Sequence, residues 1–182
     1  MKEAVDEQKD LTLAEVENTL VCCLLTSVEA PGLVSSLLRR EMFSDAAAGF
    51  VFQAIMNLYE RGVQPDMISV ETEMRRMDEA RWKELDGVSF LLTTMLNVRH
   101  GGNVLHYAGE IKRQYTLRCL AQLFAMLNFK SSTFDADPEA IISEAEDSLL
   151  KLQTEVAGSE PIRPVGELAA EAVAWHRERP GG

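Results

Sequence analysis

The chain has 182 residues, of which 46% are hydrophobic, and its formal net charge is −11 at pH 7. This length suffices for one main domain with a buried core, while the charge disfavours unaided binding to nucleic acid, which depends on clustered Lys and Arg. No apolar run approaches the ~18 residues of a membrane span, and residues 1–10 lack the layout of a secretion signal. We therefore expect a soluble, cytoplasmic protein with a disordered segment at 1–10, no direct contact with nucleic acid and none with a membrane.

The first half of the chain has the periodicity of helices, and no alternating β-branched run competes with it. Thr12 and Glu15 form a capping box at the start of the first helix. The segment 46–61 is apolar over more than half of its circumference, so we expect this helix at the centre of a bundle. Gly62 provides the left-handed position that ends it. The predicted helices of this globular bundle, residues 11–102, are 13–27, a short one from Pro31, 46–61, one capped by Asp66 or Ser69 that extends to Met77, and one around 90–98.

The second half predicts two long helices that fold back on each other as an antiparallel hairpin, residues 103–157. The first extends from Asn103 to about Phe129 without a proline, and the second starts at Pro138. The second helix places apolar residues at spacings of three and four, which is the pattern of a coiled-coil seam; they are Ile142, Ala145, Leu149, Leu152 and Val156.

The first hairpin helix carries two apolar stripes in its second half, and one partner helix cannot cover both. The additional stripe therefore requires another surface, either the globular bundle or a second copy of the chain. We predict self-association of the chain, as a dimer or a hexamer of paired hairpins, through Leu117, Leu120, Phe124, Leu127, Ile142, Leu149 and Leu152.

The segment 158–164 contains one glycine and two prolines and is predicted to be a linker. A short amphipathic helix follows within 165–178, with Leu168 and Trp175 on its apolar face. Such an isolated helix either docks on another surface through these two residues or is a frayed chain end.

No pattern of catalytic or cofactor-binding residues is present. The sequence lacks nucleotide-binding glycine loops and the G-x-S-x-G elbow, and its three histidines do not have metal-ligand spacing. Cys22, Cys23 and Cys119 lie within apolar helical patterns and are predicted to be reduced thiols. We therefore expect no enzyme activity, no cofactor and no metal in this chain.

The order of several short strings resembles the N-terminal domain of the DnaB-type replicative DNA helicases over residues ~11–155. The strings are Leu13-Ala14-Glu15-Val16-Glu17; Phe52-Gln53-Ala54-Ile55 followed by Leu58-Tyr59-Glu60-Arg61-Gly62 and Pro65-Asp66; Gly87 before Phe90-Leu91; and Asn103 with Tyr107-Ala108, Ile111 and Arg118. Two features depart from the family pattern: Val21-Cys22-Cys23 replaces small residues in the first helix, and 78–86 does not align.

The resemblance implies a non-catalytic domain that forms the collar of a hexameric helicase, with hairpins paired between subunits. It also implies that primase docks on this collar and that the helix at 165–178 packs on the motor domain of a neighbouring subunit. ATP and Mg²⁺ would belong to that motor domain, which is absent here. An alternative hypothesis is a helical DNA-binding transcription regulator, with 46–77 as the helix–turn–helix and the hairpin as the dimer interface.

Overall fold

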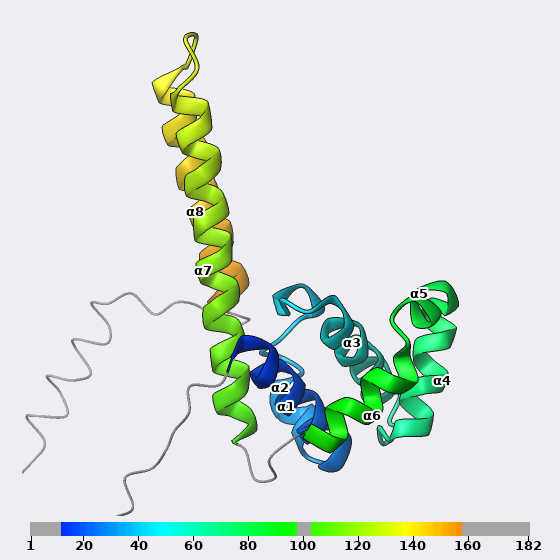
Figure 1. Cartoon of the computed structure of the whole chain (residues 1–182). Coiled ribbons are helices and arrows are strands. Elements are labelled where there is room, and N and C mark those ends of the chain that lie inside the picture. The colour runs from blue at the N-terminus through cyan, green and yellow to red at the C-terminus, as the bar shows by residue number, and fades with distance from the viewer. Residues whose placement is uncertain (1–11, 98–102, 158–182) are drawn as a thin grey trace, which may run out of the picture.

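The computed structural model describes residues 12–97 and 103–157, and within these ranges the regular elements are all helices. Helices α1 to α6 and the first part of α7 form a compact bundle, from which α7 and α8 project as a hairpin (Figure 1). The predicted all-α class, with a bundle followed by a long antiparallel hairpin, is confirmed. None of the described helices is both long and apolar enough to cross a membrane. The predicted disordered N-terminus, linker and linker helix lie outside the described residues.

The first helix, α1 (Leu13–Thr26), begins as predicted. The Thr12 hydroxyl accepts a hydrogen bond from the Glu15 amide, and the Thr12 amide donates to the Glu15 carboxylate at 2.7 Å, so the capping box is complete. Helix α2 (Ala30–Val34) starts around Pro31 but ends earlier than its apolar pattern suggests. A short 3₁₀ helix, η1 (Arg40–Met42), then leads into the third α-helix.

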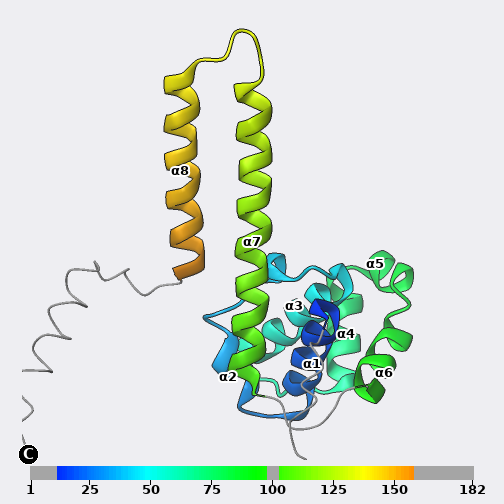
Figure 2. The same cartoon turned by 60° about the vertical axis from the view of Figure 1, so that its left-hand side comes forward.

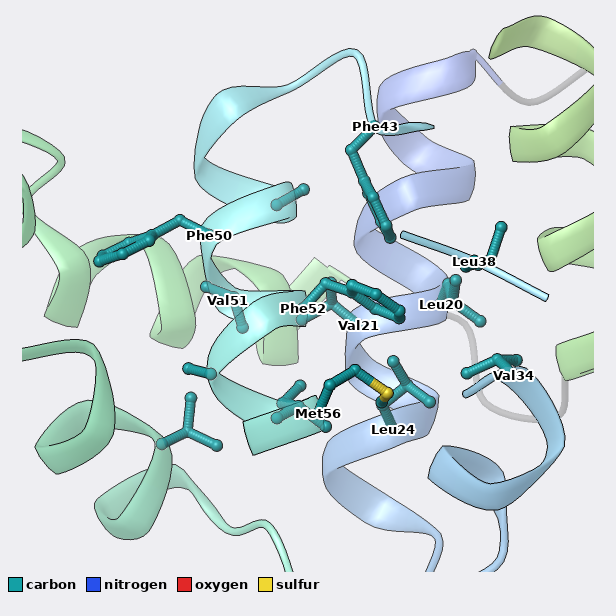
Figure 3. Packing of buried hydrophobic residues seen from close by; sticks show 14 of the residues in the cluster. Leu20, Val21, Leu24, Val34, Leu38, Phe43, Phe50, Val51, Phe52 and Met56 are labelled. Carbon is teal, nitrogen blue, oxygen red and sulfur yellow. The ribbon is translucent and has the colours of Figure 1, made fainter. Parts of the chain in front are cut away.

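Helix α3 (Ala46–Glu60) lies at the centre of the bundle, as its apolar circumference predicts. Phe52 packs against Phe43, with ring centroids 4.9 Å apart, and α1 covers the same face of α3 (Figure 3). At the end of α3, Gly62 adopts φ +71° and donates to the Tyr59 carbonyl, while Val63 donates to the Leu58 carbonyl. This pair of bonds is a Schellman motif, which requires the left-handed residue that glycine supplies.

A buried carboxylate joins α1 to the start of α3. Glu17 on α1 is fully buried and accepts hydrogen bonds from the Ser44 amide at 2.6 Å, the Ser44 hydroxyl at 2.8 Å and the Asp45 amide at 2.9 Å. Asp45 in turn caps α3 by accepting from the Ala47 amide. Glu17 therefore fixes the loop that positions α3.

Helix α4 (Met67–Met77) begins with a second capping box, in which Asp66 and Ser69 cap each other's backbone amides. The Glu73 carboxylate, only 3% exposed, lies between α3 and α4. It accepts two hydrogen bonds from Arg76, one from Arg61 at 2.5 Å and one from Asn57. These donors, Arg76 foremost, lower the pKa of Glu73 to about 2.

The segment that had no sequence assignment, 78–86, contains α5 (Glu79–Glu84), and α6 (Gly87–Asn97) follows. Trp82 is buried. Its ring centroid lies 5.6 Å from the Arg75 guanidinium, and its ring also packs on the backbone of Gly87. A Cβ at Gly87 would lie 1.9 Å from the Trp82 ring. Only a glycine therefore lets α6 start this close to the indole.

Gly87→Ala is expected to lower the free energy of unfolding by about 1.5 kcal/mol, because the added methyl group displaces a buried ring. Urea unfolding followed by circular dichroism measures this loss. Gly109→Ala is the matched control, since a Cβ there meets nothing within 4 Å. An unchanged Gly87→Ala stability would contradict the packing described here.

The hairpin consists of α7 (Val104–Ser131) and α8 (Pro138–Ala157), which lie side by side (Figure 2). Asn103 caps α7 by accepting from the Leu105 and His106 amides. Ala108 and Ile111, in the first part of α7, are buried in the core of the bundle. One continuous helix therefore belongs to both the bundle and the hairpin.

Candidate functional site

The hairpin has its own internal seam. Leu123 on α7 is buried, and one face of α8 is partly buried against α7. Lys130 and Glu144 form an ion pair near the tip, and the Tyr115 hydroxyl donates to the Glu155 carboxylate at 3.4 Å near the base. A side-chain hydrogen bond between Tyr115 and Cys119, together with partial burial, raises the pKa of Tyr115 to about 12. The partly buried α8 residues are Ile141, Glu144, Ala145, Ser148, Leu152 and Val156.

This seam is rotated relative to the one predicted from sequence. Ala145, Leu152 and Val156 face α7 as expected, but Ile142 and Leu149 are exposed. Ile141 and Ser148 are partly buried and occupy the inward positions instead. Ile142 and Leu149 thereby become available to a surface outside the hairpin.

The hairpin exposes a row of large apolar side chains. On α7, Phe124 is 60% exposed and Leu117 48% exposed, seven residues apart and so on one face of the helix. Ile142, also more than half exposed, and Leu149 have the same spacing on α8. Leu120, Leu127 and Leu152 of the predicted set are partly buried. We call Leu117, Leu120, Phe124, Leu127, Ile142, Leu149 and Leu152 the hairpin row.

Sequence reasoning missed four further exposed apolar residues on the hairpin: Leu105, Phe129, Phe134 and Leu150. Phe129 and Phe134 flank the turn, and Phe134 is fully exposed. A lone aromatic residue in a Ser- and Asp-rich turn is the signal that was available for Phe134. Leu168 and Trp175, predicted for linker-helix docking, lie outside the described residues.

Arg118 anchors the base of the hairpin to the bundle. Its Nη2 donates to the Met42 carbonyl at 2.9 Å, across 76 residues of sequence, and its guanidinium lies 5.9 Å from the Tyr115 ring centroid. Together with the buried first part of α7, this bond fixes where the hairpin leaves the bundle.

The alternative hypothesis of a DNA-binding helix–turn–helix has no electrostatic support in the described residues. On α4, the supposed recognition helix, Arg75 pairs with Glu71 and Arg76 pairs with Glu73. Their charges are neutralised within the helix, whereas recognition helices use a positive surplus at the phosphate backbone. No group of three or more His, Cys, Asp or Glu side chains suited to a metal ion occurs among residues 12–97 and 103–157.

Comparison with protein families decides the identity of this bundle. The family model described as the DnaB-like helicase N terminal domain matches residues 9–113, which are more than half of the chain. The chain belongs to the DnaB-like helicase N-terminal domain family. This matched region is the non-catalytic part of the replicative helicases.

Individual relatives of this DnaB-like domain agree with the family match. The replicative DNA helicase DnaC of Bacillus subtilis (strain 168) is 23% identical over 138 residues, covering 76% of this chain and 30% of the relative. DnaB of Rhodothermus marinus is 26% identical over 172 residues, covering 92% and 18%, and DnaB of Geobacillus stearothermophilus is 23% identical over 152 residues, covering 84% and 33%. The chain thus spans about a fifth to a third of the length of these relatives.

The fold of the DnaB-like domain also matches a solved structure. The crystal structure of the N-terminal domain of DnaB helicase from Mycobacterium tuberculosis superposes with a TM-score of 0.67 at 22% sequence identity. The superposition covers 76% of this chain and 96% of that one. At this identity the match shows a shared fold.

Proposed function

We propose that this chain is the collar-forming domain of a hexameric replicative DNA helicase of the cytoplasm, in which the hairpin row pairs subunits during DNA replication. The observation that carries the proposal is the exposure of large apolar residues along both hairpin helices, led by Phe124 and Ile142. Large apolar side chains that remain exposed in such numbers are typical of association sites. Fully burying one such side chain contributes about 1.5–3 kcal/mol.

Several such side chains on each subunit suffice to offset the cost of association, which is about 4–15 kcal/mol. In this proposal the chain itself binds no cofactor, and ATP and Mg²⁺ bind only to the motor domain of the helicase. Leu168 and Trp175 dock the linker helix on a neighbouring subunit. The assembled collar offers its helical surface to primase, which binds the collar rather than one isolated hairpin.

The pairing role is tested by replacing Phe124 and Leu127 with serine. We expect this double variant to sediment near the mass of one chain, 20.3 kDa, at concentrations where the unchanged protein forms dimers or larger species. The apparent dissociation constant should rise at least about tenfold, because burial of two large side chains is lost. Analytical ultracentrifugation measures the mass, and circular dichroism verifies the helical content.

Ile68→Ser is the matched control, since Ile68 is a strongly exposed apolar residue on α4, outside the hairpin. It should leave the oligomer mass unchanged. An unchanged mass for the Phe124/Leu127 variant, or a purely monomeric unchanged protein, would refute pairing through the hairpin row. Primase docking is tested by calorimetric titration of a primase into both proteins, with weaker binding expected for the monomeric variant.

A further inference from the structure

The ring of Phe50 lies apart from the centre of the core. Figure 3 shows it pointing away from Phe52 and Phe43, although it is only 1% exposed. Two cations cover it: the guanidinium carbon of Arg40 in η1 lies 5.4 Å from its centroid, and that of Arg81 in α5 lies 5.5 Å from it. Segments that are 41 residues apart in sequence thus bring two positive charges to one ring.

Neither of these guanidinium groups has a carboxylate partner among the described residues. Other basic residues of this part of the bundle do form ion pairs: Arg61 and Arg76 both pair with Glu73, and Lys83 pairs with Glu79. The Nε of Arg81 is buried and has no acceptor. The two guanidinium carbons are at most about 11 Å apart, since each lies within 5.5 Å of the same centroid. In a chain of net charge −11, these are two neighbouring positive charges that form no ion pair within the described residues.

The backbone around both arginines is held in place. A Cβ at Gly49 would lie 2.9 Å from the Arg40 carbonyl oxygen, so η1 sits directly on the first turns of α3. The Arg81 amide donates to the Asp78 carboxylate at 2.9 Å, which fixes the first turn of α5. Contact with the Phe50 ring orients the two planar guanidinium groups. The charges are therefore positioned before any ligand arrives.

We propose that Arg40 and Arg81 form a binding site for a pair of carboxylates on an acidic segment of a partner protein. Both side chains are partly exposed, so a ligand can reach them. Guanidinium groups bind carboxylates through paired hydrogen bonds, and such charge-assisted bonds are stronger than neutral ones. Arginine is also enriched among the residues that dominate protein–protein binding. The site is separate from the hairpin row and acts whether or not hairpins pair.

Two observations favour an acidic protein segment over a nucleic acid. Single-stranded nucleic acids bind by stacking bases on exposed aromatic rings, and the Phe50 ring is covered by the two arginines. A phosphate backbone also requires a track of cations. The other basic residues of α4 and α5 are already paired within the chain. A site of two charges matches two carboxylates on one protein segment, each bound by one guanidinium group.

The test uses the complete 182-residue chain and a labelled peptide of about ten glutamates as the probe. Binding is followed by fluorescence anisotropy at low and at high salt, and NMR shifts of the Arg side chains and the Phe50 ring locate it. The Arg40→Gln/Arg81→Gln double variant should bind about tenfold more weakly. Lys112→Gln/Lys151→Gln is the matched control, because it removes the same formal charge from positions that form no ion pair. That control should bind the peptide as tightly as the unchanged protein.

Salt-sensitive binding of the peptide, shifts at Phe50 and loss in the arginine variant alone support the site. The proposal is overturned by absent binding, by equal affinity of the arginine variant, or by shifts confined to other residues. Tighter binding of a ten-nucleotide oligothymidylate than of the peptide also overturns it in favour of nucleic acid. Circular dichroism melting of each variant shows that the fold persists, so that weaker binding is assigned to the lost charges.

Discussion

Replacing Glu17 with alanine is expected to lower the free energy of unfolding by about 3 kcal/mol. The fully buried carboxylate accepts three hydrogen bonds, from the Ser44 amide and hydroxyl and from the Asp45 amide. Bonds to a charged acceptor contribute more than neutral ones, and their loss leaves donors at the start of α3 without a protein partner. Urea unfolding followed by circular dichroism measures the difference.

Two further variants separate this effect from general loss of charge or volume. Glu17→Gln preserves the shape but retains a single acceptor oxygen, so about half of the loss should remain. Glu29→Ala removes a carboxylate that is exposed and caps nothing, so its stability should stay within about 0.5 kcal/mol of the unchanged protein. Equal stability of the Glu17→Ala and Glu29→Ala variants would refute the anchoring role of Glu17.

Acidification is expected to remove about 2–3 kcal/mol of stability through Glu73 alone. Bonds from Arg76, Arg61 and Asn57 lower the pKa of Glu73 from 4.5 to about 2. A carboxylate whose pKa is lower in the folded state stabilises the fold above its unfolded pKa, and this contribution is lost as the pH falls from about 4.5 to about 2. The shift corresponds to about 3 kcal/mol, which solvent around the half-exposed arginines reduces somewhat.

Glu73→Gln isolates this contribution, because it cannot ionise yet has a similar size. The unfolding free energies of the two proteins should differ most near pH 6 and converge towards pH 2. Glu71→Gln is the control, since Glu71 forms an exposed pair with Arg75 on the same helix. Parallel curves for the Glu73→Gln variant and the unchanged protein across this pH range would contradict the assignment.

Local signals in the sequence predict most of the helix boundaries. The capping box at Thr12, the left-handed Gly62 and the cap at Asp66 each depend on residues within a few positions, so they can be recognised without knowing the fold. The central position of α3 also follows from its own apolar circumference. These features are decided by the chain over one or two helical turns.

Contacts between distant segments could not be predicted in this way. The Glu17 bonds to Ser44 and the Arg118 bond to Met42 join residues 27 and 76 positions apart. Helix α5 lacks a strong pattern of its own and forms where Trp82 packs on Gly87. The partly buried position of Ser148 in the hairpin seam is likewise one that hydrophobic periodicity does not indicate.

The hairpin row was predicted in part by local periodicity and depends in part on contacts between the two helices. Periodicity correctly indicated more apolar surface on α7 than one helix can cover, and Leu117 and Phe124 are exposed. Which α8 residues share that exposure depends on the rotation of α8 against α7, and this rotation reflects the Lys130–Glu144 and Tyr115–Glu155 contacts. Tertiary contacts, rather than the spacing of apolar residues, decide it.

The continuity of α7 has a consequence for how this domain evolves and how it can be engineered. Ala108 and Ile111 anchor one end of the rod, and Leu123 organises the other. Inserting a single amino acid between them would turn the distal half by about 100° and advance it by about 1.5 Å. Length changes in this stretch are therefore tolerated only near whole multiples of the helical repeat. The number of residues between Ile111 and Leu123 thus determines the direction in which the hairpin's apolar face points relative to the bundle.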